Sequence, residues 1–303
     1  LNSDEFSTDA EILKNHCVDW RGEFKGDSDL VIFPKSVKKV SQILKFCFKH
    51  DLPIVPQGGN TGLVGGGVPR KNKNEIIINL SKLNRIRDID SIGNSITVES
   101  GCILDNVKNE LYNKNLEFPL SMGSRGSCQI GGNIATNAGG VNVIKYGTFR
   151  QNIIGIEAVL ADGTIFSSLK KIKKNNTGID LKHLLIGSEG ILGIITAATI
   201  QIFPLPKDKL IIWTSFKEFK DVLDFYHQMI RKFNNLITSF EFMNKESIQI
   251  LEKNETKISN LKKNNCYCLV ELSNFYSIES FNDFISSRID FEKINTDDFI
   301  ISK

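Results

Sequence analysis

Residues 56–69 read PQGGNTGLVGGGVP, and six of the eleven residues from Gln57 to Gly67 are glycine. A second run, from Gly123 to Gly140, holds six more of the chain's 23 glycines. Loops this rich in glycine expose consecutive backbone N–H groups with no Cβ in the way, and such groups bind phosphate oxygens. The two runs therefore predict a site that grips the pyrophosphate of a nucleotide cofactor.

Two common phosphate-binding motifs do not fit these runs. A Rossmann fingerprint needs G-x-G-x-x-G opening directly into a helix, whereas Val68-Pro69 and a polar stretch follow the first run. A P-loop needs G-x-x-x-x-G-K-[ST], and no lysine follows Gly67. The alternative to a nucleotide site is that the two runs are simply long mobile loops. Such loops are uncommon and usually rich in charge and serine, whereas these runs carry Ile, Val, Thr and Asn.

The bulk composition is that of an ordinary globular protein. The 303 residues are 41% hydrophobic and 24% charged. A net charge of +3 gives no reason to expect nucleic acid or an anionic membrane as partner, and no apolar stretch approaches the ~18 residues of a membrane span. The six cysteines form no CxxC pair and the four histidines lie far apart. The sequence therefore predicts reduced, buried thiols and no metal site.

A change in composition predicts a domain boundary at residues 203–207, Phe-Pro-Leu-Pro-Lys. The 97 residues after Pro206 contain neither glycine nor proline. We predict an N-terminal segment over residues 1–25 and a cofactor domain over 26–206, with lobes at about 26–90 and 91–206. A second domain begins at 207 and runs to 303. Because the chain starts with Leu1 and ends in an apolar run without an evident partner strand, we expect it to be a fragment.

Apolar spacing predicts an alternating order of elements. In the cofactor domain, Ser36 is expected to cap a helix that starts at Val37, and Asp162-Gly163 to turn a hairpin. In the second domain, strands and helices alternate, which is typical of a sheet with helices on one face. The predicted strands are 30–33, 54–55, 76–80, 96–99, 153–160, 164–167, 191–203, 210–216, 236–243, 266–272 and 299–301; the predicted helices are 37–48, 105–113, 222–233, 245–253 and 278–289.

The chain resembles the FAD-binding PCMH-type flavoenzymes of the vanillyl-alcohol-oxidase superfamily, and within it the D-2-hydroxyglutarate dehydrogenase, D-lactate dehydrogenase and glycolate oxidase subunit group. Six segments carry the resemblance: PQGGNTGLVGGGVP (56–69), FPLSMGSRGSCQIGGNIATNAGG (118–140), LADGT (160–164), NTGID (176–180), IGSEGILGIIT (186–196) and FEFM (240–243). It implies an α+β fold, with a two-lobed PCMH-type FAD-binding domain followed by an incomplete α+β substrate domain.

The resemblance also implies which residues bind FAD. The two glycine runs would hold the pyrophosphate and ribityl chain, and a third segment around Glu189 would line the adenine side. No histidine or cysteine stands in the first run, so FAD is expected to be non-covalent, and Cys128 of the second run is interpreted as a packing residue. The implied residues are Gln57, Gly58, Gly59, Asn60, Thr61, Gly62, Leu63, Gly123, Ser127, Ile130, Gly132, Asn133, Thr136, Asn137, Gly139, Glu189, Gly190, Gly193 and Ile194.

The reaction implied is oxidation of a D-2-hydroxy acid, of the D-2-hydroxyglutarate or D-lactate type, to the 2-oxo acid by hydride transfer to flavin. The electron acceptor would be an electron-transfer flavoprotein, a quinone or a cytochrome. The family's carboxylate-binding arginine, its histidine-rich site for a metal such as zinc and its catalytic histidine are expected after residue 303. Arg70, Arg125 and Arg150 are interpreted as surface or phosphate-side charges, and no catalytic residue is assigned.

Two alternatives stay open on the sequence. The chain could be the FAD-binding subunit of a multi-subunit, glycolate-oxidase-like complex without its own complete active site. It could also be a module that binds another nucleotide and has no redox role. The expected location is the cytoplasm, or the mitochondrial matrix if the source is a eukaryote.

Overall fold

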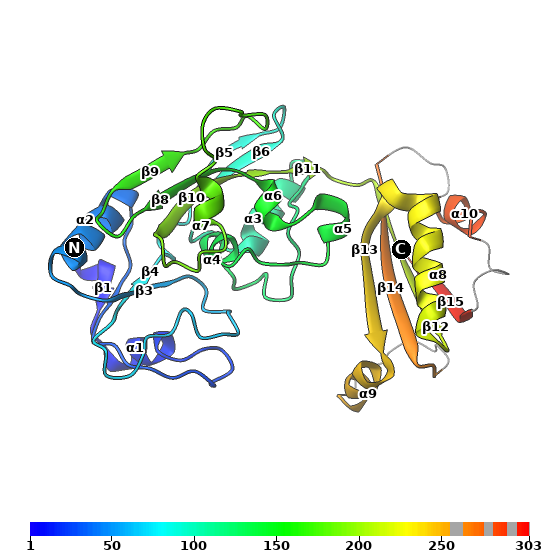
Figure 1. Ribbon diagram of the computed structural model, residues 1–303, viewed down its shortest axis with the longest axis horizontal. Coiled ribbons are helices and arrows are strands. Elements are labelled where there is room, and N and C mark those ends of the chain that lie inside the picture. Colours follow the sequence, from blue (N-terminus) through cyan, green and yellow to red (C-terminus); the bar gives the residue numbers. More distant parts are fainter. Residues whose placement is uncertain (255–262, 276–280, 290–295, 303) are drawn as a thin grey trace. The chain divides into compact units, whose positions relative to one another are not determined.

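The computed structural model describes residues 1–254, 263–275, 281–289 and 296–302. The chain divides into two compact units (Figure 1). The first comprises Leu1–Gly139 and Thr148–Phe203, and the second comprises Gly140–Gly147 and Pro204–Lys303. The domain bounds that the sequence predicts, at residues 26–206 and 207–303, stay a prediction. In the described part of the chain, no helix is both long and apolar enough to cross a membrane.

The first unit opens with a four-stranded sheet in the order β1-β2-β4-β3 (Figure 1). Strands β2, β4 and β3 are parallel, and β1 is antiparallel to β2. As predicted, the Ser36 hydroxyl caps α2 by accepting from the Lys39 backbone N–H, and the buried face of α2 packs in a cluster with Ile32 and Ile78 of the sheet. The bounds are η1 Ser3–Glu5, β1 Phe6–Ser7, α1 Ala10–His16, β2 Val31–Ile32, α2 Val37–Lys49, β3 Ile54–Gln57 and β4 Ile76–Asn79.

A five-stranded antiparallel sheet completes the first unit, in the order β5-β6-β10-β8-β9. Side chains of α3 and α4 share the unit's largest apolar cluster with one face of this sheet. The predicted hairpin is confirmed, since β8 pairs with β9 and Gly163 takes a positive φ of 84°. The bounds are β5 Ile86–Asp90, β6 Ser95–Glu99, α3 Leu104–Tyr112, β7 Leu116–Glu117, α4 Ile130–Ala135, α6 Phe149–Asn152, β8 Ile153–Val159, β9 Ile165–Ser168, α7 Lys182–Leu185 and β10 Ile194–Gln201.

The same sheet carries a charged network. Arg87 Nη2 lies 3.0 Å from Glu157 Oε1, and Arg87 Nε lies 3.2 Å from Glu99 Oε1. Arg85 also donates to Glu99, which is only 1% exposed. Burial raises the pKa of the Glu99 carboxyl, but hydrogen bonds from Arg85 and Arg87 outweigh burial and leave that pKa below its ordinary value. Glu99 is therefore held as a buried carboxylate.

The second unit is an antiparallel sheet in the order β13-β14-β12-β15 (Figure 1). Helices α8 and α10 pack in one apolar cluster with Ile212, Val270 and Cys268 of the sheet, so they cover the same face. The predicted burial of the thiols is confirmed, and Cys266 and Cys268 both lie in this cluster. The bounds are α5 Val143–Tyr146, β11 Phe203–Pro204, β12 Asp208–Phe216, α8 Phe219–Phe233, η2 Asn234–Leu236, β13 Ile237–Asn244, α9 Lys245–Lys253, β14 Cys266–Asn274, α10 Phe281–Ser286 and β15 Thr296–Ser302.

Two expectations were wrong. The last strand has a partner, because β15 pairs with β12 and brings Ile301 opposite Ile212. The second glycine run is not all loop, because its centre forms α4. Tertiary contact overrides the low helix propensity of Gly131 there, since this residue packs directly on Ser100. Part of the predicted helix 278–289 lies outside the described residues.

Candidate functional site

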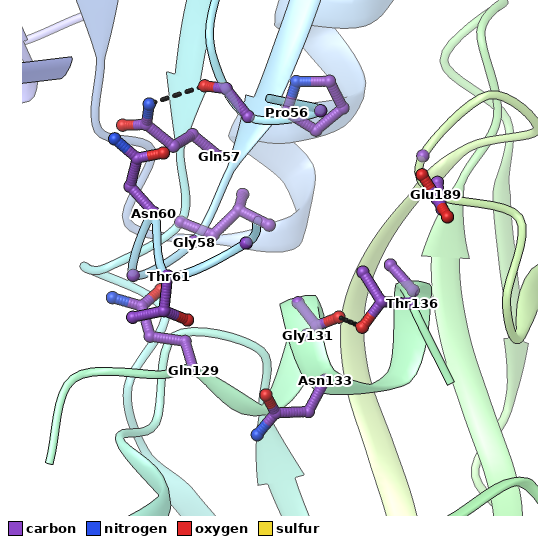
Figure 2. A pocket seen from close by; sticks show the side chains of 18 of the residues that line it. Pro56, Gln57, Gly58, Asn60, Thr61, Gln129, Gly131, Asn133, Thr136 and Glu189 are labelled. Carbon is purple, nitrogen blue, oxygen red and sulfur yellow. Dashed lines mark hydrogen bonds between the residues drawn. The ribbon is translucent and has the colours of Figure 1, made fainter. Parts of the chain in front are cut away.

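Both glycine runs wall a single cavity in the first unit (Figure 2). Its cavity volume is about 200 Å³. The lining residues are Pro56, Gln57, Gly58, Gly59, Asn60, Thr61, Gly62, Val64, Gly65, Gly66, Gly67, Leu80, Ser100, Met122, Gln129, Gly131, Gly132, Asn133, Ala135, Thr136, Ala138, Glu189, Gly190, Gly193, Ile194 and Ile195.

The two runs touch each other at Gly59. A Cβ built on this residue would lie 2.0 Å from the carbonyl oxygen of Ser127 and 2.9 Å from its carbonyl carbon. A similar contact fixes α4, because a Cβ on Gly131 would lie 2.5 Å from Ser100 Cβ, and the Gly131 N–H donates to Ser100 O at 2.7 Å. Glycine is therefore needed at both positions for close approach of backbones.

Two non-glycine residues that line the cavity have a left-handed backbone. Asn60 and Glu189 have φ values of 51° and 52°, a left-handed conformation that asparagine tolerates but glutamate rarely adopts. Glu189 is held there by its N–H, which donates to Ala135 O at 2.9 Å. Such strain persists where the surrounding structure over-determines it, and it clusters at ligand sites.

Two buried polar atoms in the cavity wall have no hydrogen-bond partner among the described residues. They are Ser100 Oγ and Gln129 Oε1. Burying a polar atom without a hydrogen-bond partner costs roughly 1–3 kcal/mol of folding free energy. The described residues alone do not supply a partner for either of these two atoms. A ligand with hydroxyl or N–H donors would remove that cost.

These features fit FAD. Its diphosphate needs N–H donors, and the glycine backbone of the cavity can supply them; none of the lining residues named above is lysine or arginine. Its ribityl, ribose and ring donors match the unpaired acceptors of Ser100 and Gln129. Among the described residues, no group of three or more His, Cys, Asp or Glu side chains is placed to hold a metal ion.

Thirteen of the nineteen residues implied for FAD line the cavity, and contact with FAD stays a prediction for each. Those that line it are Gln57, Gly58, Gly59, Asn60, Thr61, Gly62, Gly132, Asn133, Thr136, Glu189, Gly190, Gly193 and Ile194. Six do not: Leu63, Gly123, Ser127, Ile130, Asn137 and Gly139.

Three of these six have other roles in the fold. Ile130 is fully buried in the apolar cluster. Asn137 Oδ1 accepts from the Arg150 backbone N–H at 3.0 Å, and Ser127 offers its carbonyl to the contact with Gly59. Cys128 is 1% exposed and its Sγ accepts from Asn133 Nδ2 at 3.4 Å, which supports its interpretation as a packing residue.

Sequence reasoning missed several lining residues. Gln129 and Gly131 stand inside the second run, so the motif itself was their signal. Leu80 and Ser100 follow directly after β4 and β6, and they reach the cavity only because those strands end there. No local pattern marks them.

Residues 28–168 match the family model described as an FAD binding domain. The chain belongs to this family of FAD-binding proteins, and FAD is its cofactor. The solved structure of alkyldihydroxyacetonephosphate synthase aligns with a TM-score of 0.79 and 20% identity, covering 99% of this chain and 58% of that one. At that identity the likeness shows the fold, and the predicted α+β architecture is confirmed.

Several relatives are named as D-2-hydroxyglutarate dehydrogenases or related enzymes. The chain is 41% identical over 246 residues to the mitochondrial D-2-hydroxyglutarate dehydrogenase of Danio rerio, covering 81% of this chain and 46% of that protein. It is 36% identical over 251 residues to the D-2-hydroxyglutarate–pyruvate transhydrogenase of Saccharomyces cerevisiae, covering 82% and 50%. The chain thus spans about half the length of the curated relatives it matches.

Proposed function

We propose that the protein is an FAD-dependent dehydrogenase that oxidises a D-2-hydroxy acid, of the D-2-hydroxyglutarate or D-lactate type, to the 2-oxo acid. The observation that carries the proposal is the single cavity walled by both glycine runs, with unpaired acceptors at Ser100 and Gln129. The substrate class rests on the relatives named above. When bound, FAD supplies the hydride acceptor for the carbinol carbon of the substrate.

The chain's own residues bind and orient the cofactor. Backbone N–H groups of the two runs hold the diphosphate, and Glu189 at the rim offers a carboxylate to ribose hydroxyls. Neither histidine nor cysteine lines the described cavity, so binding is proposed to be non-covalent. The close contacts at Gly59 and Gly131 fix the wall before the ligand enters, which lowers the ordering cost of binding.

The arginines near the runs serve the fold. Arg70 Nε donates to Glu75 Oε1 at 2.7 Å, and Arg125 Nε lies 3.3 Å from Asp105 Oδ1. Arg150 Nη1 donates to the carbonyl of His183 at 2.7 Å. Because each has an internal partner, we assign the substrate carboxylate to none of them, and the catalytic base is likewise not assigned within residues 1–303.

The proposal is tested on the purified protein in two stages. The visible spectrum is recorded before and after acid precipitation, and flavin released into the supernatant is the expected result. The flavin-loaded protein is then mixed anaerobically with D-2-hydroxyglutarate, D-lactate and their L-enantiomers. Bleaching by a D-isomer alone is expected of protein that also carries the carboxylate-binding arginine and the catalytic base, whereas residues 1–303, in which neither group is assigned, are expected to stay unbleached by themselves. Protein that carries both groups and is bleached by neither D-isomer contradicts the proposed activity.

The second candidate is an FAD-binding subunit that completes its active site with another chain. The composition of the cavity favours this candidate. Its described lining residues include no arginine to bind the carboxylate of a hydroxy acid and no histidine to accept the hydroxyl proton. Flavin that bleaches with a D-2-hydroxy acid only after a partner subunit is added would establish this candidate. Re-oxidation by electron-transfer flavoprotein, a quinone analogue, cytochrome c or pyruvate identifies the acceptor.

The location is proposed from the relatives. The Danio rerio dehydrogenase is named as mitochondrial, which supports the mitochondrial matrix if the source is a eukaryote and the cytoplasm otherwise. Immunogold labelling of the source cells tests this proposal.

A further inference from the structure

The N-terminal segment lies directly behind the first glycine run. The carbonyl of Val18 accepts from Asn60 Nδ2 at 2.8 Å. A Cβ on Gly65 would lie 2.7 Å from the ring of Phe24. His16, at the end of α1, contacts Gln57, which opens the run. The wall of the cavity therefore has a second layer made by residues 16–24.

The Gln57 side chain makes all its hydrogen bonds inside the protein. Its Oε1 accepts from His16 Nδ1 at 2.5 Å and from Asn79 Nδ2 at 3.2 Å. Its Nε2 donates to His16 O at 2.8 Å and to Gly67 O at 2.7 Å. The residue is only 2% exposed. All four contacts are internal, so Gln57 presents its backbone to the cavity and uses its amide to tie Gly67 back to the start of the run.

His16 is itself fixed in place. Leu13 and Cys17, on either side of it, are buried in a cluster with Val31 and Ile77 of the parallel sheet. The ring of Phe33 meets the imidazole edge-on with centroids 5.4 Å apart. Because both Gln57 Nε2 protons go to carbonyls, the Gln57 oxygen must face His16, and the hydrogen-bond network assigns a proton to His16 Nδ1.

We propose that His16 is a positioning residue for FAD, which acts through Gln57. Its Nδ1–H and carbonyl orient the Gln57 amide, and that amide closes the loop from Gln57 to Gly67 in the shape that presents backbone N–H groups to the diphosphate. The inference rests on FAD occupying the cavity. It gives the N-terminal segment, which shares no residue with the glycine runs, a defined part in cofactor affinity.

The test is a double-mutant cycle on FAD affinity. The dissociation constant of FAD is measured by fluorescence titration of flavin-free protein for His16→Ala, Gln57→Ala and the double variant. His16→Ala removes one of the four hydrogen bonds of the Gln57 amide and is expected to weaken FAD binding roughly five- to tenfold, whereas Gln57→Ala removes all four and is expected to weaken it at least as much. Because the two residues act in series, the double variant should bind FAD as Gln57→Ala does.

Two further variants separate positioning from general structure. His16→Asn keeps an N–H near the position of Nδ1 and should restore most of the affinity. If His16→Ala fails to fold, His16→Leu, which fills the space but has no N–H in its side chain, takes its place in the cycle. Lys14→Ala, on the exposed side of the same helix, should leave the affinity unchanged. Unchanged affinity in His16→Ala, or additive losses in the double variant, overturns the proposal. Wild-type protein that folds but binds no FAD overturns the cofactor assignment instead.

Discussion

Replacing Gly59 with alanine tests the contact between the two glycine runs. The new Cβ would lie 2.0 Å from Ser127 O, whereas van der Waals contact between these atoms needs ~3.2 Å or more, close to the carbon–oxygen contacts seen in folded proteins. The loops must therefore separate by about 1 Å or strain their backbones. Overpacking of this kind costs roughly 1–3 kcal/mol, and the atom that is struck is backbone, which cannot rotate away.

The change is expected to lower both stability and FAD affinity. A loss of about 1.4 kcal/mol in binding free energy corresponds to a tenfold higher dissociation constant, so Gly59→Ala should weaken FAD binding roughly 10- to 100-fold. Affinity is measured by fluorescence titration of flavin-free protein, and thermal unfolding by circular dichroism.

Gly62→Ala is the matched control. It lies in the same run, and a Cβ there meets no atom within 4 Å. It should leave the melting temperature unchanged or slightly raised, because alanine reduces the entropy of the unfolded chain. If Gly59→Ala matched Gly62→Ala in the melting temperature of flavin-free protein, the two runs would not be in contact as described.

Three further predictions concern the interior. In α4, Gly131→Ala should lower the melting temperature of flavin-free protein relative to Gly132→Ala, because only the first Cβ meets Ser100; equal melting temperatures would contradict the packing. Glu99→Gln removes the buried carboxylate that Arg85 and Arg87 share, leaves Arg87 with Glu157 alone among the described residues, and should cost about 1–3 kcal/mol at pH 7 by urea unfolding, the range for hydrogen bonds to charged groups. Since the folded-state pKa of Glu99 is lowered, its stabilisation is present above the unfolded value of 4.5 and is lost as the pH falls through the folded pKa. The wild type should therefore approach the variant in acid, and a constant difference would refute this. Burial raises the pKa of Cys268 to about 12, so brief alkylation at pH 8 followed by mass spectrometry should find it unmodified in native protein and modified after denaturation.

The sequence predicts those features that depend on residues close together in the chain. Ser36 capped α2 as expected because its hydroxyl needs only the N–H three residues ahead. The helix predicted over residues 222–233 from apolar spacing is present as α8, and its Val222, Phe225 and Met229 are buried. In the same way, the glycine runs identified most of the cavity wall, because loop backbone is specified by its own residues.

Features that depend on distant partners escaped sequence reasoning. The partner of β15 is β12, some 85 residues earlier, and no pattern within either strand encodes that pairing. Ser100 enters the cavity because β6 ends beside α4. His16 reads as one more polar residue on a short helix, and only the folded chain brings it to Gln57. Tertiary geometry decides all three.

The distances along the chain between the walls of the cavity bear on how the protein is made. The first wall begins at Pro56 and the last residues to line the cavity are Ile194 and Ile195. At ~5–20 residues per second of synthesis, roughly 140 residues separate these two walls by about 7–28 s. During that interval the first glycine run has left the ribosome without the strand that completes its cavity. FAD therefore binds after β10 has been translated. When the cofactor is scarce, the chains that lack it are chains that already contain the whole FAD binding domain.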